Sequence, residues 1–275
     1  MTTSDSPTSG IHAAIPRDRL LHEWLRAEPE GSQQLKFAVT WLKEADGKRA
    51  AVLRALSETV FLHHNDPVIT RRKLARLGYP KLAEAVDRRP KPHNTRLGNF
   101  GEVIASEFLR QLRGYEVPVY RLRYNTNDDS SPKGDDVLAF EFAERGTGKK
   151  DTVIVAEVKV RAEFKSAAVE EAHKALRMGF RPRPKSFQFV VDVLFREDRD
   201  EEALRLLDLS QKFGKRSLAR RTCLFLVTGN QPTDPFACLA GKRLAPGLEA
   251  VQLTLQELGP FVNEVFDSEV DLDEI

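Results

Sequence analysis

The sequence predicts an α/β fold in which a mixed sheet is covered by helices on both faces. Short runs rich in β-branched and aromatic residues alternate with segments that carry apolar residues at helical spacing. Several of the β-rich runs are almost wholly apolar, which is typical of strands buried on both faces. Strands are therefore expected at 117–124, 136–142, 152–161, 186–195, 222–228 and 248–255.

The composition is that of a soluble globular protein. The chain has 275 residues, of which 41% are hydrophobic and 31% are charged, enough for one ordinary domain and a smaller appendage. Two cysteines, Cys223 and Cys238, are too few for a zinc site or a disulfide framework. No apolar run approaches the roughly 18 residues that would span a bilayer, and the polar first ten residues do not resemble a secretory signal. A cytoplasmic location is the expectation.

The charges are unevenly distributed, although the net charge is only +2. The last twelve residues hold acidic side chains and no basic one, so the rest of the chain is net basic. A basic body with an acidic tail suits a nucleic-acid binder whose tail masks its own surface or binds a partner. A tail that is merely solubilising explains the same pattern equally well.

The first third of the chain is expected to be a helical region at 16–94, after a disordered N-terminus at 1–15. Apolar spacing predicts helices at 17–25, 33–44, 50–62 and 70–77, with a short one after Pro80. His63 and His64 are interpreted as a helix end, because adjacent helical residues do not share a face. The run at 88–94 is expected to be a linker, since its prolines cannot continue a helix, and its positive charges suit a phosphate backbone.

A second domain is predicted at 95–263, followed by an acidic tail at 264–275. Its first helix runs from Leu97 to Gly114, with Asn99 as the expected N-cap. Further helices are expected at 166–178, 201–213 and 256–266. From Phe100 to Phe195 the predicted order of elements is α-β-β-β-α-β.

The stretch from Gly134 to Arg161 is the most informative part of the chain. Two β-rich segments flank a loop with paired glycines and charges, which is typical of a hairpin. Side chains alternate along a strand, so Glu157 and Lys159 share one face at the end of the second strand. At the start of the first strand, Asp135 and Asp136 point to opposite sides, and Asp136 is the preferred partner of Glu157.

These residue types suit metal-dependent phosphodiester hydrolysis. Asp136 and Glu157 are expected to bind Mg²⁺ or Mn²⁺, with Glu102 as a third carboxylate that acts directly or through water. Lys159 would orient the nucleophile or stabilise charge on the phosphoryl oxygens. Taken singly, each feature has an ordinary explanation: a turn end, an exposed strand ion pair, or an acid in the first turn of a helix.

The combination of G-D-D-V-L-A-F and V-A-E-V-K resembles the PD-(D/E)XK nuclease superfamily. The resemblance covers about Leu97 to Phe195 and implies a restriction-endonuclease-like core with the order α-β-β-β-α-β. It also implies metal and catalytic roles for Asp136, Glu157 and Lys159, with Glu102 as the helical glutamate. The chain departs from the pattern in having Gly134 and Asp135 before the acid, in place of Pro-Asp.

A narrower resemblance is to HamA, the nuclease subunit of Hachiman-type antiphage systems. It rests on G-E in the helix, G-D-D before the strand, and A-E-V-K followed by a helix. Ala156 stands where those proteins usually have glycine. This resemblance implies a helicase partner and a role in bacterial antiviral defence.

The substrate is expected to be DNA, with RNA left open. The basic residues Arg181, Arg183 and Lys185 directly precede a predicted strand and are candidate phosphate contacts. The resulting hypothesis is a Mg²⁺-dependent DNA endonuclease regulated by a helicase partner, and a homo-oligomer is compatible with it. The alternatives are a stand-alone restriction or repair endonuclease, and a nucleic-acid-binding regulatory subunit with a silenced nuclease fold.

Overall fold

The computed structural model describes residues 15–28, 35–77, 87–130, 134–144, 146–179 and 183–271. The strands of these residues are β1 (Leu25–Glu28), β2 (Ala38–Glu44), β3 (Val137–Glu141), β4 (Asp151–Arg161), β5 (Leu218–Thr228) and β6 (Leu248–Thr254). The α-helices are α1 (Leu20–Trp24), α2 (Arg49–His64), α3 (Pro67–Leu77), α5 (His93–Glu107), α6 (Ser166–Gly179), α7 (Phe187–Arg196), α8 (Asp200–Ser210) and α9 (Leu258–Asp267). Shorter helical turns are η1 (Arg17–Arg19), η3 (Phe108–Leu112, a π-helix), η4 (Arg121–Tyr124) and η5 (Ala237–Leu239).

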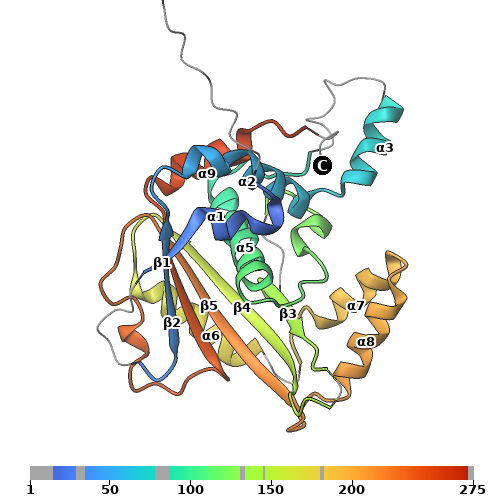
Figure 1. Cartoon of the computed structure of the whole chain (residues 1–275), viewed down its shortest axis with the longest axis vertical. Coiled ribbons are helices and arrows are strands. Elements are labelled where there is room, and N and C mark those ends of the chain that lie inside the picture. Colours follow the sequence, from blue (N-terminus) through green and yellow to red (C-terminus); the bar gives the residue numbers. More distant parts are fainter. Residues whose placement is uncertain are drawn as a thin grey trace, which may run out of the picture.

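The described strands form one mixed sheet in the order β1-β2-β6-β5-β4-β3 (Figure 1). The two pairs at the edges, β1 with β2 and β3 with β4, are antiparallel, whereas the inner pairs are parallel. Parallel strands require long crossovers: the one from β4 to β5 holds α6, α7 and α8, whereas the one from β5 to β6 holds only the short turn η5. The α/β class with a mixed sheet is confirmed.

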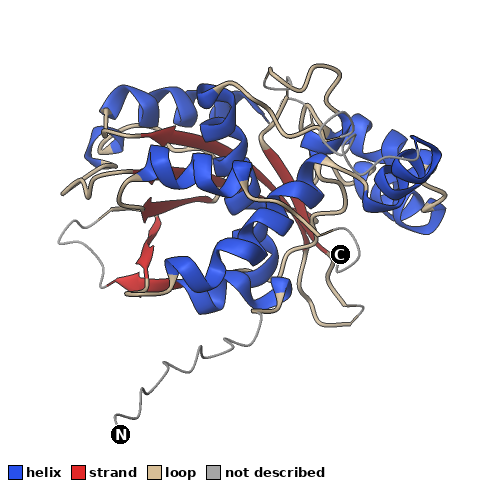
Figure 2. Cartoon of the chain, turned by 90° about the horizontal axis from the view of Figure 1, so that it is seen from above, coloured by secondary structure: helices blue, strands red, loops and turns tan. Residues whose placement is uncertain are grey.

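Helices cover both faces of the sheet, as Figure 2 shows. On one face, α1, α2, α5 and α9 pack on alternate sheet residues such as Ile154, Ala156 and Phe225. On the other face, α6, α7 and α8 pack on Val153, Val155 and their neighbours. The apolar β-rich runs of the sequence arise because both sides of each central strand are buried.

The expected helix at 33–44 is wrong, because residues 38–44 form strand β2. This strand pairs in parallel with β6, from Ala38 opposite Glu249 to Lys43 opposite Thr254. Its sequence contains β-branched and aromatic residues that suit a strand, and its partner lies some two hundred residues later in the chain. The N-terminal region therefore contributes β1 and β2 to the sheet that the second predicted domain completes; the division at residue 94 stays a prediction.

The expected strand at 117–124 is also wrong. Only Glu116 forms a bridge, with Phe140 of β3, and residues 121–124 form the turn η4. Pro118 lacks an amide hydrogen for a ladder. The arginines of η4 use their side chains for bonds to other elements, since Arg121 contacts Glu102 and Arg123 donates to the carbonyl oxygen of Leu62.

The expected strand at 186–195 is helix α7. Its apolar residues Phe187, Val190, Val191 and Leu194 also recur at helical spacing and are buried on one side. A short apolar run does not distinguish a strand from a buried helix by period alone. The order of elements from α5 is therefore α5, β3, β4, α6, α7, α8, β5, β6, α9, and not the predicted α-β-β-β-α-β.

Helix α5 begins earlier than expected, at His93, after Pro92. Asn99 is not its N-cap but a buried residue inside the helix, where its side-chain amide donates to Nε2 of His64 at 2.9 Å. His63 and His64 end helix α2, as predicted, and both are buried.

The ends of the chain are only partly described. Residues 1–14, the short helix expected after Pro80 and the last four residues lie outside the described residues. Glu264 and Asp267, assigned to the acidic tail, belong to helix α9, and Asp267 pairs with Arg96. Cys223 and Cys238 are free, and no described helix is long and apolar enough to cross a membrane.

Candidate functional site

The hairpin β3–β4 brings the two predicted metal-binding acids together. The strands are antiparallel, with Val137 opposite Ala156, so continuation of the register sets Asp136 opposite Glu157. Directly opposed residues of an antiparallel pair lie on the same face, with Cβ atoms about 4.5–5.5 Å apart. The predicted pairing of Asp136 with Glu157 across a hairpin therefore agrees with the register.

Asp135 and Asp136 make different contacts. Oδ2 of Asp136 accepts a hydrogen bond from the backbone N–H of Val158 at 2.7 Å, so its side chain extends the pairing beyond the first residue of β3. Oδ2 of Asp135 accepts from the backbone N–H of Ser186 at 2.8 Å, and the Asp135 N–H donates to Oγ of Ser186 at 3.0 Å. Asp135 thus joins β3 to the start of α7, while Asp136 faces the other acids.

The end of β4 carries the second half of the site. Glu157 and Lys159 lie on one face, and Nζ of Lys159 is 3.0 Å from Oε1 of Glu157. The same face is buried at Val153 and Val155 and exposed at Arg161. Strand β4 therefore leaves the hydrophobic core towards its end, as the alternation of apolar and charged side chains predicted, and Glu157, Lys159 and Arg161 lie beyond the buried part of that face.

Helix α5 supplies Glu102 because it crosses β4 at very short range. A Cβ atom built on Gly101 would lie 2.3 Å from Cγ2 of Val160 and 2.8 Å from Cγ1 of Val158. Only glycine permits this approach, which sets the next residue, Glu102, beside the hairpin. Oε2 of Glu102 is 2.9 Å from Nη2 of Arg121, and the same nitrogen is 3.6 Å from Oδ1 of Asp136.

The acids of the site resist ionisation. Burial raises the pKa of Glu102 to about 7, against the opposing effect of the Arg121 charge. Burial also raises the pKa of Asp136, and burial together with the Asp136 charge raises that of Glu157. Buried carboxylates that repel one another are favourable sites for a cation, because a cation removes both penalties.

A small cavity of about 20 Å³, enough for one water molecule, adjoins Glu102 and Asp136, whereas Glu157 is not among the residues that line it. It spans the β3 edge of the sheet, between α5 and α7, and is lined by residues that include Glu102, Ser106, Arg121, Asp136 and His63. The lining residues therefore come from three separate stretches of the chain: the end of α2, residues 102–138 and the start of α7.

The donor chemistry fits a hard divalent cation. Carboxylate oxygens are the ligands that Mg²⁺ prefers, and Mg²⁺ is commonly held by one or two carboxylates and completed by water. Asp136 and Glu157 supply such a pair, and Glu102 lies close enough for its pKa to respond to both. Within the described ranges, no three acidic, histidine or cysteine side chains are gathered into a metal-binding group.

Of the two described basic residues predicted to contact DNA, Lys185 is the one whose charge reaches the acids. Its charge opposes the effect of burial on the pKa of both Asp135 and Glu157, and its side chain is exposed. Arg183 is also exposed, and Arg181 lies outside the described residues. The position of Lys185 follows from the link between Asp135 and the start of α7.

The linker arginines are used inside the protein. Arg88 donates to the carbonyl oxygens of Arg123 and Asn125 and pairs with Asp128 at 2.7 Å. Arg89 pairs with Asp87 at 2.8 Å and donates to the carbonyl oxygen of Ser268. These two guanidinium groups are thus engaged within the protein, and their contact with a phosphate backbone stays a prediction.

Two residues of the site were not predicted from the sequence. Arg121 and Ser186 both lie in segments that were expected to be strands. Nothing in the local sequence distinguishes them, because their partners Glu102 and Asp135 come from other elements. Their roles depend on tertiary contacts alone.

The comparisons with known proteins agree on one family. A family model described as HamA matches residues 18–238, well over half of the chain. The chain is also 29% identical over 212 residues to the Hachiman protein HamA of Bacillus cereus. The matched region covers 75% of this chain and 74% of that relative. The resemblance to HamA is thereby confirmed, and the chain belongs to the HamA family.

Proposed function

We propose that this chain is a metal-dependent endonuclease that hydrolyses DNA phosphodiester bonds and is controlled by a helicase partner. Membership of the HamA family indicates a component of a Hachiman antiphage defence system. The support for nuclease activity is the hairpin register: Val137 pairs with Ala156, so by continuation the preceding Asp136 falls opposite Glu157, whose Oε1 is 3.0 Å from Nζ of Lys159.

The proposed roles follow from charge and position. Asp136 and Glu157 would hold Mg²⁺ or Mn²⁺, with Glu102 as an outer or direct ligand. When bound, the metal would lower the pKa of a water molecule and polarise the phosphate. Lys159 would stabilise negative charge on the phosphoryl oxygens, and the exposed Lys185 would contact a neighbouring phosphate.

We also propose that the fold is a variant of the restriction-endonuclease-like core. The elements that support this are α5, the hairpin β3–β4, helix α6 and the parallel strand β5 next to β4. The strand that such a core has before the hairpin is reduced here to the bridge between Glu116 and Phe140. The helical hairpin α7–α8 follows α6 (Figure 1).

The test is Mg²⁺-dependent loss of intact plasmid. We expect Glu157→Gln and Lys159→Ala each to lower the cleavage rate by about a hundredfold or more, because each removes charge at the reacting phosphate. The matched controls are Glu170→Gln and Lys242→Ala, which break an exposed acid–lysine pair of 2.8 Å elsewhere. If the site variants cut as fast as the parent chain, the assignment of the active site is wrong.

The partner is tested by co-purification and by adding it back to the cleavage assay. Capture of a helicase that changes the cleavage rate would support the defence effector, and full activity without any partner would favour the stand-alone nuclease. DNA that is bound but never cut, with or without the helicase, would favour the regulatory subunit. DNA binding through phosphate contacts should weaken steeply as salt rises.

A further inference from the structure

The guanidinium group of Arg121 lies between two of the carboxylates assigned to the site. Its Nη2 is 2.9 Å from Oε2 of Glu102 and 3.6 Å from Oδ1 of Asp136. The side chain is only 10% exposed, so water screens these contacts little. A single nitrogen of Arg121 therefore faces oxygens from both a helix and a strand end.

The fold makes room for this guanidinium. Gly134 has a φ of +132°, a conformation that favours glycine, and a Cβ atom there would lie 3.3 Å from Nη1 of Arg121 and 2.7 Å from Oγ of Ser186. The turn that carries Arg121 is anchored through its backbone by Arg88, which donates to the carbonyl oxygens of Arg123 and Asn125. Arg88 thus anchors the backbone of the turn that carries Arg121, and Gly134 leaves space for the guanidinium group of Arg121.

Protein groups neutralise each acid of the site. Arg121 pairs with Glu102 and approaches Asp136, the N–H of Val158 donates to Asp136, and Lys159 pairs with Glu157. Oδ2 of Asp136 already accepts from the N–H of Val158, so a divalent cation bound to Asp136 would need Oδ1, the oxygen that faces Arg121. Two cations cannot occupy that position together, since they repel strongly at such distances in a buried site.

We propose that Arg121 is the resident counter-cation of this site and sets the affinity for metal, because its guanidinium must withdraw from Glu102 and Asp136 when a divalent cation enters. The inference rests on the proposed function, since it takes these acids as metal ligands. Arg121 is in this role a positioning residue: it keeps the buried acids together in the metal-free protein and opposes metal uptake at low metal concentration.

The test is the affinity for Ca²⁺, measured by calorimetry at pH 8.5 on the full chain. Arg121→Gln should bind Ca²⁺ at least about tenfold more tightly than the parent chain, because a competing charge has been removed. The matched control is Arg123→Gln in the same turn, whose guanidinium donates to the carbonyl oxygen of Leu62 at 2.6 Å and to no carboxylate of the site. Its affinity should stay near that of the parent chain. Unchanged or weaker binding by Arg121→Gln, or no binding by either chain, overturns the proposal.

A second measurement follows Arg121 in the parent chain itself, and a variant serves only to assign its signal. In the parent chain labelled with ¹⁵N-arginine, the Nε signal of Arg121, assigned from its absence in Arg121→Lys, should shift as Ca²⁺ is added, whereas that of Arg123 should not. A signal that stays constant while Ca²⁺ binds overturns the proposal. Plasmid cleavage separates the failure of this proposal from the failure of the proposed function. If the parent chain cleaves and Arg121→Gln has unchanged Ca²⁺ affinity, only the role of Arg121 is refuted. If the parent chain neither binds metal nor cleaves, the proposed function is refuted.

Discussion

The close crossing of α5 over β4 can be tested by adding one methyl group. In Gly101→Ala, the new Cβ would lie 2.3 Å from Cγ2 of Val160 and 2.8 Å from Cγ1 of Val158, both well inside van der Waals contact. Both valines are buried, at 7% and 8% exposure, and belong to the strand that carries the site. The helix must therefore move away from the sheet and carry Glu102 with it.

The expected change in the free energy of unfolding of Gly101→Ala is the difference between two opposing effects. Forcing an extra methyl group into a packed core destabilises a protein by about 1–3 kcal/mol. Replacing glycine by alanine inside a helix returns about 0.5–1 kcal/mol of intrinsic helix stability. We therefore expect Gly101→Ala to lower the free energy of unfolding by about 1–2 kcal/mol.

Urea denaturation, monitored by circular dichroism, measures this change. The matched control is Gly259→Ala, also in a helix, where the nearest atom to the new Cβ is in the ring of His93 at 3.4 Å. It should not lower the free energy of unfolding, and at most should raise it by the intrinsic helix gain of about 0.5–1 kcal/mol. Val160→Ala removes the closest obstacle, so the double variant with Gly101→Ala should be more stable than the sum of the single effects predicts.

Two outcomes would refute the reasoning. If Gly101→Ala is as stable as the parent chain or more stable, the helix does not approach the strand as closely as described. If the two substitutions are strictly additive, Val160 is not the obstacle, because residues in contact normally show coupling of about 0.5–3 kcal/mol. Loss of stability with additive effects would point to Val158 instead, whose Cγ1 would lie 2.8 Å from the new Cβ.

Two further predictions concern buried glutamates and are measured by urea denaturation in EDTA. Glu102 has a folded-state pKa of about 7, above the usual value of 4.5, so its neutral form favours folding at low pH and this contribution is lost as pH rises through 7. Glu102→Gln should therefore gain about 3 kcal/mol relative to the parent chain between pH 4.5 and 8, and a constant difference would contradict the burial of this carboxyl. Glu107 behaves oppositely: although burial opposes ionisation, the hydrogen bond from His63 at 3.0 Å and the ion pair with Arg110 at 2.5 Å lower its pKa to about 2. Glu107→Gln should be destabilised by about 3–5 kcal/mol at pH 7, and this deficit should shrink as pH falls from 4.5 towards 2; a deficit independent of pH would show that charge is not the cause.

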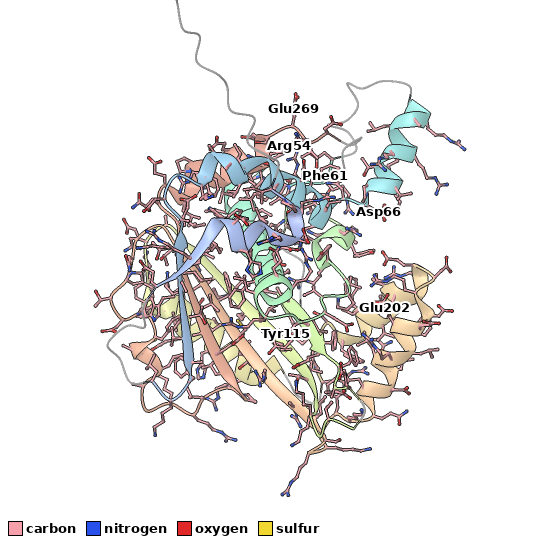
Figure 3. All side chains as sticks on the ribbon, viewed as in Figure 1. Arg54, Phe61, Asp66, Tyr115, Glu202 and Glu269 are labelled. Atoms are coloured by element: carbon pink, nitrogen blue, oxygen red, sulfur yellow. The ribbon has the colours of Figure 1, made fainter. Side chains whose placement is uncertain are left out.

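Helix α3 and the helical pair α7–α8 were predicted from their sequences to different extents. Helix α3 was expected at 70–77 and begins at Pro67, where Oδ1 of Asp66 accepts from the N–H groups of Val68 and Ile69 at 2.8 and 3.0 Å. Figure 3 shows Asp66 at the base of this helix. The hairpin α7–α8 was half predicted, because α8 has clear helical spacing and an acidic first turn, whereas α7 is a short apolar run.

The sequence by itself determined the hairpin and the placement of its acids. Alternation along a strand is local, so the shared face of Glu157 and Lys159 needed no knowledge of other elements. The amphipathic helices α2, α5 and α6 were likewise predictable, because helical spacing is a property of consecutive residues.

Only the tertiary structure decided which neighbours these acids have. Strand β2 forms because β6 lies beside it, α7 is a helix because it covers a sheet that is already complete, and Arg121 reaches Glu102 because Gly101 lets α5 approach. Each of these outcomes depends on contacts between residues far apart in the chain, and no local period carries that information. The acids could therefore be predicted from the sequence, whereas the position of the Arg121 guanidinium beside Glu102 and Asp136 follows only from the tertiary structure.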